Sequence, residues 1–204
     1  MFRFLSIFCL VFASLITFLE TPCVVAKRGQ IFIFPGVSGS GKTSLCLHLV
    51  THGFTCYSDE LAVINKDFSP QPLPFPVSIK SGAWPLFDSA WPELGHSKIW
   101  EKDNGIALKY LLLPTDLDAP VDSKITQQTI IFPTFDPEAV HASYKKLSPT
   151  QALVNIIQAG YQIKQGLNQA NIVDLISFVN TIPACEFRFR HFDDLYSSEM
   201  KVLF

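Results

Sequence analysis

Residues 36–44 read GVSGSGKTS and follow the apolar run IFIFP at residues 31–35. Gly36, Gly41, Lys42 and Thr43 have the spacing of the phosphate-binding loop called a P-loop, which joins a buried strand to a helix. Backbone N–H groups in such a loop form a nest for anions, and the helix dipole adds partial positive charge. The motif therefore predicts a nucleotide-binding site.

We expect the whole stretch to contact the nucleotide: Gly36, Val37, Ser38, Gly39, Ser40, Gly41, Lys42, Thr43 and Ser44. Lys42 is predicted to reach the β- and γ-phosphates, and the Thr43 hydroxyl to ligate Mg²⁺. A guanine-reading N-K-x-D motif is not found, because NKDF at residues 65–68 places Asp67 one position too early. ATP with Mg²⁺ is the expected pair of ligands.

A phosphate-binding loop also needs a carboxylate, which holds the magnesium shell or takes a proton from the attacking group. Asp59 and Glu60 are adjacent at the end of a predicted strand, after a short helix and a turn at Gly53. This connection predicts that the two acids return to the phosphates. The alternative is a solvated turn.

Predicted strands and helices alternate along the chain, which favours an α/β fold. Ser148 and Gln151 form the pattern of a capping box, with Pro149 at the first helical position. The sequence predicts strands at residues 30–35, 54–58, 61–65, 107–114, 128–135 and 185–192, an extended segment at 75–80, and helices at 42–50, 148–160 and 168–182.

The composition indicates a globular protein, with 48% apolar and 17% charged residues among 204. The net charge of −2 argues against a nucleic-acid binder that works by neutralising phosphates. Five scattered cysteines without a C-x-x-C pair are interpreted as reduced residues of an intracellular protein: Cys9, Cys23, Cys46, Cys56 and Cys185.

The amino-terminal residues 1–20 form a separate apolar segment, since no charge occurs between Phe4 and Leu19. The segment is predicted to be a core helix or strand pair of the domain, or a signal or anchor. The expected location is cytoplasmic, with membrane association through residues 4–19 as the alternative.

Residues 21–204 carry an ordered set of motifs: the P-loop, a short helix, Ser58-Asp59-Glu60, and Pro76-Val77-Ser78-Ile79-Lys80-Ser81-Gly82-Ala83-Trp84. In this order they resemble the catalytic domain of HPr kinase/phosphorylase, and more narrowly the HPr-kinase-like serine kinases. The stretches IIFPTF and LSPTQAL extend the resemblance over roughly residues 20 to 195. It implies a phosphoenolpyruvate-carboxykinase-like α/β fold with a mixed sheet.

The resemblance implies a Mg·ATP-dependent kinase that acts on a Ser or Thr hydroxyl of a protein or peptide. Asp59 and Glu60 would be the magnesium-side and catalytic acids, with Lys42 and Lys80 as catalytic cations and Thr43 and Asp59 on the metal. The alternative for Lys80 is an exposed lysine at the end of a strand. Two positions depart from the family: Thr21 replaces a histidine, and Thr134 replaces an arginine. The second hypothesis is therefore a non-catalytic ATP-binding module.

Other residues are expected to be structural. His48 and His52 have a metal-compatible spacing, but without a third ligand we interpret them as ordinary helix residues. Trp84, Trp91 and Trp100 are expected to pack under the sheet edge. The sequence leaves open whether the chain forms a homo-oligomer.

Overall fold

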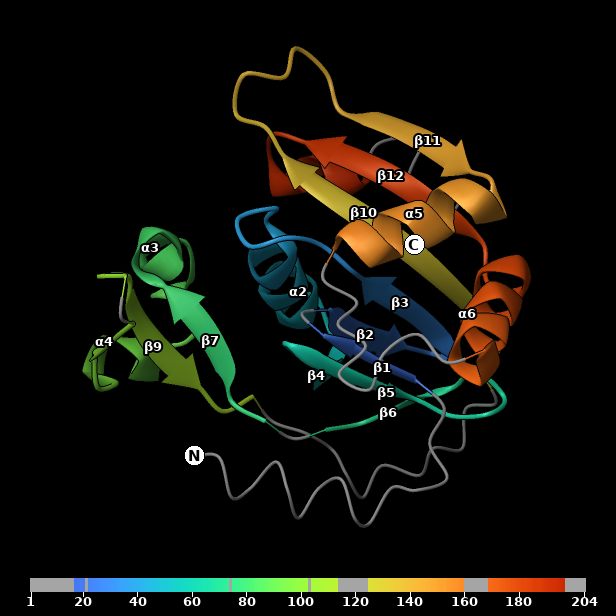
Figure 1. Ribbon diagram of the computed structural model, residues 1–204. Coiled ribbons are helices and arrows are strands. Elements are labelled where there is room, and N and C mark those ends of the chain that lie inside the picture. Colours follow the sequence, from blue (N-terminus) through green and yellow to red (C-terminus); the bar gives the residue numbers. More distant parts are fainter. Residues whose placement is uncertain are drawn as a thin grey trace.

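The computed structural model describes residues 17–20, 22–73, 75–102, 104–113, 125–159 and 169–196. A mixed sheet of six strands lies at its centre (Figure 1). In spatial order the strands are β11 (Ser143–Leu147), β12 (Ala184–Phe189), β10 (Gln127–Phe135), β3 (Gln30–Phe34), β2 (Cys23–Lys27) and β4 (Thr55–Ser58).

β3, β10 and β12 are parallel, whereas β2 runs antiparallel to both β3 and β4. β4 therefore points in the same direction as β3, and both strands end at the same edge of the sheet. β11 is antiparallel to β12. The mixed α/β class with a mixed sheet is confirmed.

Helices cover both faces of this sheet (Figure 1). α2 (Lys42–Thr51) packs on one face, where Phe32 and Phe34 of β3 enter the core. α5 (Pro149–Gln158) and α6 (Gln169–Thr181) lie on the other, above Ile31 and Ile33. Burial on both faces explains why β3 is a continuous apolar run.

Two smaller sheets flank the central one. One contains β1 (Thr17–Glu20), β5 (Leu61–Ile64) and β6 (Pro70–Gln71). The other contains β7 (Val77–Lys80), β9 (Ala107–Leu111) and β8 (Trp100–Glu101). With the short helices α3 (Trp84–Phe87) and α4 (Glu93–His96), this second sheet forms a lobe beside α2 (Figure 1).

Most predicted elements are confirmed within a few residues of their bounds, and Ser148 and Gln151 form the predicted capping box. Several elements differ. The strand predicted at 61–65 is β5, which lies outside the central sheet. β2, β6, β8 and β11 are additional strands, and α3 and α4 are additional short helices. The strand predicted at 185–192 ends at Phe189 and is followed by a short 3₁₀ helix, η2 (Phe192–Tyr196).

The described part of the amino-terminal apolar segment is strand β1, not a helix, and it pairs with β5. Residues 1–16 lie outside the described residues. None of the helices in the described part of the chain is long and apolar enough to cross a membrane.

The interpretation of all five cysteines as reduced is wrong for two of them, because Cys23 and Cys46 form a disulfide between β2 and α2. Cys56 and Cys185 are free and buried, and Cys9 lies outside the described residues. Spacing along the chain did not reveal the pair, since the two residues meet only when α2 packs on β2.

The tryptophans behave differently from one another. Trp91 is buried, and the indole N–H of Trp84 donates a 2.9 Å hydrogen bond to the Ile79 carbonyl. Trp100 is instead 49% exposed, with the Lys98 ammonium 4.0 Å from its ring centroid. The packing prediction is therefore wrong for Trp100, because β8 is a two-residue strand at the edge of the small sheet.

Candidate functional site

The glycine-rich loop, residues 36–44, connects the end of β3 to the start of α2. Gly41 has a φ of +89°, in the left-handed region that glycine adopts without strain. A Cβ atom there would lie 2.9 Å from Phe189 Cζ and 3.0 Å from Phe135 Cβ. The loop is therefore held against the ends of β10 and β12, and no larger residue fits at this position.

Gly41 is also the N-cap of α2, and it supplies no side-chain hydrogen bond to the first turn. The N–H groups of a helix's first turn have no partner within the helix and carry partial positive charge. Val37, Ser38 and Gly39 at the tip of the loop are exposed to solvent, while Thr43 and Ser44 in the first turn are half-buried. The loop thus offers an open site for an anion.

Lys42 lies inside the loop and is only 9% exposed. Its ammonium is 3.5 Å from the Val37 carbonyl oxygen, which belongs to the same loop. Burial lowers the pKa of Lys42, and the nearby Asp59 carboxylate opposes this effect. A bound phosphate would add negative charge here and favour the charged form of the lysine.

Asp59 follows β4 directly and is 4% exposed. The Thr43 hydroxyl donates a 3.2 Å hydrogen bond to its Oδ1, and its Oδ2 is buried without a hydrogen-bond partner in the described part of the chain. Burial, with a smaller effect of Glu60, raises the pKa of Asp59 to about 6. A buried carboxylate oxygen without a partner, beside a hydroxyl, suits Mg²⁺, which prefers oxygen ligands.

Glu60 differs from its neighbour because it is exposed to solvent. It adopts a φ of +75°, which is uncommon for a residue other than glycine and costs roughly 1 kcal/mol or more. The Ser78 hydroxyl donates a 2.6 Å hydrogen bond to Glu60 Oε1. Ser78 thus fixes the carboxylate, a contact that the sequence analysis did not predict.

The small sheet brings two further lysines to this region. The Lys80 ammonium, on β7, donates a 2.5 Å hydrogen bond to Ser38 Oγ of the glycine-rich loop. Both Lys80 and Lys102 repel the Lys42 charge and contribute to its lowered pKa. Lys102 follows β8 and was not identified from the sequence, because no motif contains it.

The two positions at which the chain departs from the HPr kinase/phosphorylase pattern lie in different parts of the chain. Thr134 is exposed near the end of β10, in register with Arg188 of β12, whose guanidinium forms an ion pair with Asp136. Thr21 lies outside the described residues. The structure therefore brings five of the predicted residues together around the loop: Lys42, Thr43, Asp59, Glu60 and Lys80.

His48 and His52 contact aromatic side chains at the far end of α2. Their ring centroids are 4.3 Å apart, His48 stacks on Phe192, and its Nε2 lies 3.2 Å from the Tyr196 hydroxyl. Among the described residues, neither histidine belongs to a group of three potential metal ligands. The expectation of ordinary helix residues is consistent with these contacts.

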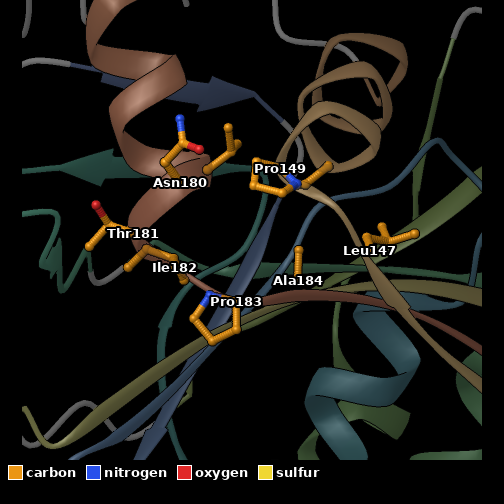
Figure 2. Close-up of a pocket in the computed structure, with 9 residues that line it drawn as sticks. Leu147, Pro149, Asn180, Thr181, Ile182, Pro183 and Ala184 are labelled. Carbon is orange, nitrogen blue, oxygen red and sulfur yellow. The ribbon is translucent and has the colours of Figure 1, made fainter.

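A cavity of about 240 Å³ lies between the start of α5 and the end of α6 (Figure 2). Its lining contains no charged side chain: Leu147, Pro149, Ala152, Val179, Asn180, Thr181, Ile182, Pro183 and Ala184. These helices cover the face of the sheet opposite α2, so the cavity is separate from the glycine-rich loop. Since the lining offers no acidic or basic side chain that could activate the Thr181 hydroxyl, the cavity is a poor candidate for chemistry.

No family model matches the chain, and no match is found among curated proteins. The functional assignment therefore depends on the motifs and on the geometry described above.

Proposed function

We propose that the chain is a Mg·ATP-dependent kinase that transfers the γ-phosphoryl group to a Ser or Thr hydroxyl of a protein or peptide. The glycine-rich loop would be a P-loop, in a phosphoenolpyruvate-carboxykinase-like fold similar to that of HPr kinase/phosphorylase. The observation that carries this proposal is the convergence of Thr43, Asp59 and Glu60 at one end of α2.

The buried and the exposed residues of the site have different proposed roles. Backbone N–H groups of the loop bind the phosphates, and Lys42 neutralises charge on the γ-phosphoryl group. Thr43 and Asp59 would hold Mg²⁺, which when bound neutralises charge that develops on the phosphate oxygens. The Asp59 Oδ2 atom without a partner supports this role, because a metal ion would supply the missing interaction.

Glu60 is the proposed general base. Its carboxylate is exposed, so that an acceptor hydroxyl can approach it, and the Ser78 hydrogen bond orients it. It takes the proton of the Ser or Thr hydroxyl as the oxygen attacks the γ-phosphorus, while the bond from that phosphorus to the bridging oxygen breaks and ADP leaves. Lys80, which already contacts the loop through Ser38, adds positive charge beside the phosphates.

The test is transfer from γ-labelled ATP to an array of Ser- and Thr-containing peptides with Mg²⁺. We expect label on hydroxyl side chains with the parent protein and roughly 10²- to 10⁴-fold less with Glu60→Gln, the usual contribution of a general base. Glu101→Gln, at an exposed glutamate of β8, is the matched control. Equal rates for parent and Glu60→Gln would contradict the assigned role.

The non-catalytic ATP-binding module is the alternative, and Thr134 is the observation in its favour. This exposed threonine supplies no cation at the end of β10, and the neighbouring Arg188 is engaged by Asp136. Saturable ATP binding by the parent protein, with neither labelled peptide nor released phosphate, would support this alternative.

A further inference from the structure

Three cysteines meet on the face of the central sheet that α2 covers. Cys23 comes from β2, Cys46 from α2 and Cys56 from β4, and their sulfur atoms all lie within 4.8 Å of one another. Cys23 and Cys46 are fully buried, and Cys56 is 6% exposed. The disulfide joins Cys23 to Cys46, yet the free Cys56 sulfur is 3.8 Å from that of Cys46. Cys46 therefore contacts both its partner and a third thiol.

The three residues lie directly beneath the candidate site. Cys46 is one helical turn after Thr43 on α2, and Cys56 precedes Asp59 by three residues. Cys23 pairs with Phe34, the last residue of β3 before the glycine-rich loop. A bond from Cys46 to Cys23 joins α2 to β2, whereas a bond to Cys56 would join it to β4, the strand that Asp59 follows.

We propose that Cys23, Cys46 and Cys56 form an internal thiol–disulfide exchange site in which Cys46 is the shared sulfur. The Cys56 thiolate attacks Cys46 Sγ and forms a Cys46–Cys56 bond. The Cys23–Cys46 bond breaks, and its electron pair leaves with the Cys23 sulfur. That sulfur takes up the proton that Cys56 released. The exchange consumes no external oxidant or reductant, because one disulfide and one thiol are present before and after it.

Burial makes this exchange slow at neutral pH. Burial, with a smaller contribution from the nearby Asp59 carboxylate, raises the pKa of the Cys56 thiol to about 12, so the reactive thiolate is rare. The rate should therefore rise about tenfold for each pH unit between 7 and 10, because the thiolate fraction does.

Exchange explains the cluster better than metal binding does. Three thiolates around a zinc ion would leave one net negative charge, and around a monovalent copper ion two. The surrounding side chains are apolar, including Phe32, Leu45 and Leu49, and an uncompensated buried charge is costly. Among the described residues the group also lacks the fourth ligand that zinc prefers. A disulfide with a neutral thiol buries no charge.

Peptide mapping distinguishes the two disulfides cleanly. Cleavage after Lys and Arg places Cys46 and Cys56 in one peptide, residues 43–66. Further cleavage after Glu separates Cys23 from Cys9 at Glu20, and at Glu60 it shortens the other peptide to residues 43–60, which still hold both cysteines. The Cys23–Cys46 disulfide links two peptides, whereas the Cys46–Cys56 disulfide closes a loop within residues 43–60. The full-length protein is incubated at pH 7 to 10, quenched with acid, alkylated with N-ethylmaleimide under denaturing conditions and mapped without reduction.

We expect the looped peptide to appear with time and to form about tenfold faster per pH unit. Cys23→Ala, oxidised with glutathione disulfide, should give the looped peptide quantitatively, whereas Cys185→Ala, at a buried cysteine of β12 outside the group, should behave as the parent does. Only the interpeptide bond in the parent at every pH would overturn the proposal. So would alkylation of both Cys46 and Cys56 in oxidised Cys23→Ala protein that unfolds cooperatively.

Discussion

Asp59 and Glu60 are neighbours in sequence but occupy opposite environments. Asp59 is buried beside Thr43 and Lys42. Glu60 faces solvent with a left-handed backbone conformation, and its carboxylate accepts a hydrogen bond from the Ser78 hydroxyl. The strained backbone at Glu60 turns the chain so that one carboxylate points inward and the next outward. Two acids of the same chemistry thereby acquire separate proposed roles, one on the metal and one on the acceptor.

The burial of Asp59 makes stability depend on pH. In the unfolded chain this carboxyl ionises near pH 3.8, whereas in the folded protein it keeps its proton until about pH 6. Within that window the folded state binds more protons, so the free energy of unfolding contributed by Asp59 falls as pH rises. Above it, the cost of the buried carboxylate is about 3 kcal/mol.

Asp59→Asn should therefore stabilise the fold at pH 7.5 by about 1 to 3 kcal/mol, and much less at pH 4. Urea unfolding of the parent and variant at both pH values measures this difference. The same variant should lose Mg²⁺-dependent nucleotide binding. Equal unfolding free energies at pH 7.5 would show that Asp59 carries no burial cost.

Glu60→Gly tests the strain at the second acid. Glycine accepts a positive φ without a steric penalty, so the variant should be more stable by about 1 kcal/mol, reduced by the lost hydrogen bond from Ser78. Phosphoryl transfer should fall as it does in Glu60→Gln. A variant less stable than Glu60→Gln in urea unfolding would argue against strain at this residue.

At the scale of elements, α2 and β4 position the candidate site. The start of α2 and the end of β4 lie at the same edge of the central sheet. The short helix ends at Thr51, Gly53 turns the chain with a φ of +82°, and β4 returns to the loop. Local sequence patterns predicted this connection, since an apolar run, a glycine and an alternating strand are local signals. They did not predict that β2 lies between β3 and β4, which depends on pairing between distant residues.

The contrast between local signals and contacts between distant residues also explains which other features of the structure were predicted. The capping box at Ser148 and Gln151 follows from four consecutive residues, and it forms as predicted. The Cys23–Cys46 disulfide and the Ser78–Glu60 hydrogen bond join separate elements, and no local pattern encodes them.

The capping box gives a prediction at this scale. Ser148→Ala removes the hydroxyl that accepts the Gln151 backbone N–H, so the free energy of unfolding should fall by about 1 kcal/mol. Ser143→Ala, at an exposed position of β11, is the control and should change stability by less than about 0.5 kcal/mol. Chemical denaturation measures both. Equal effects of the two substitutions would indicate that the cap contributes nothing specific.

At the scale of the whole molecule, the site forms where the central sheet meets the small lobe. The sheet supplies the glycine-rich loop and the two acids, and the lobe supplies Ser78 and Lys80 through β7. α2 contacts β7, so the lobe lies against the helix that follows the glycine-rich loop. The order of motifs in the sequence predicted that the segment containing Lys80 would lie near the glycine-rich loop. It did not predict that this segment, β7, would belong to a separate three-stranded sheet.

The central claim is that the glycine-rich loop binds Mg·ATP through Lys42, and calorimetric titration of the protein with ATP tests it most directly. With Mg²⁺ present, we expect saturable one-to-one binding by the parent and by Lys146→Ala, a control at an exposed lysine of β11. Lys42→Ala should weaken binding at least 100-fold, about 2.7 kcal/mol, because it removes the buried cation that is proposed to neutralise the phosphates. ATP binding by Lys42→Ala as tight as that of the parent would contradict the account.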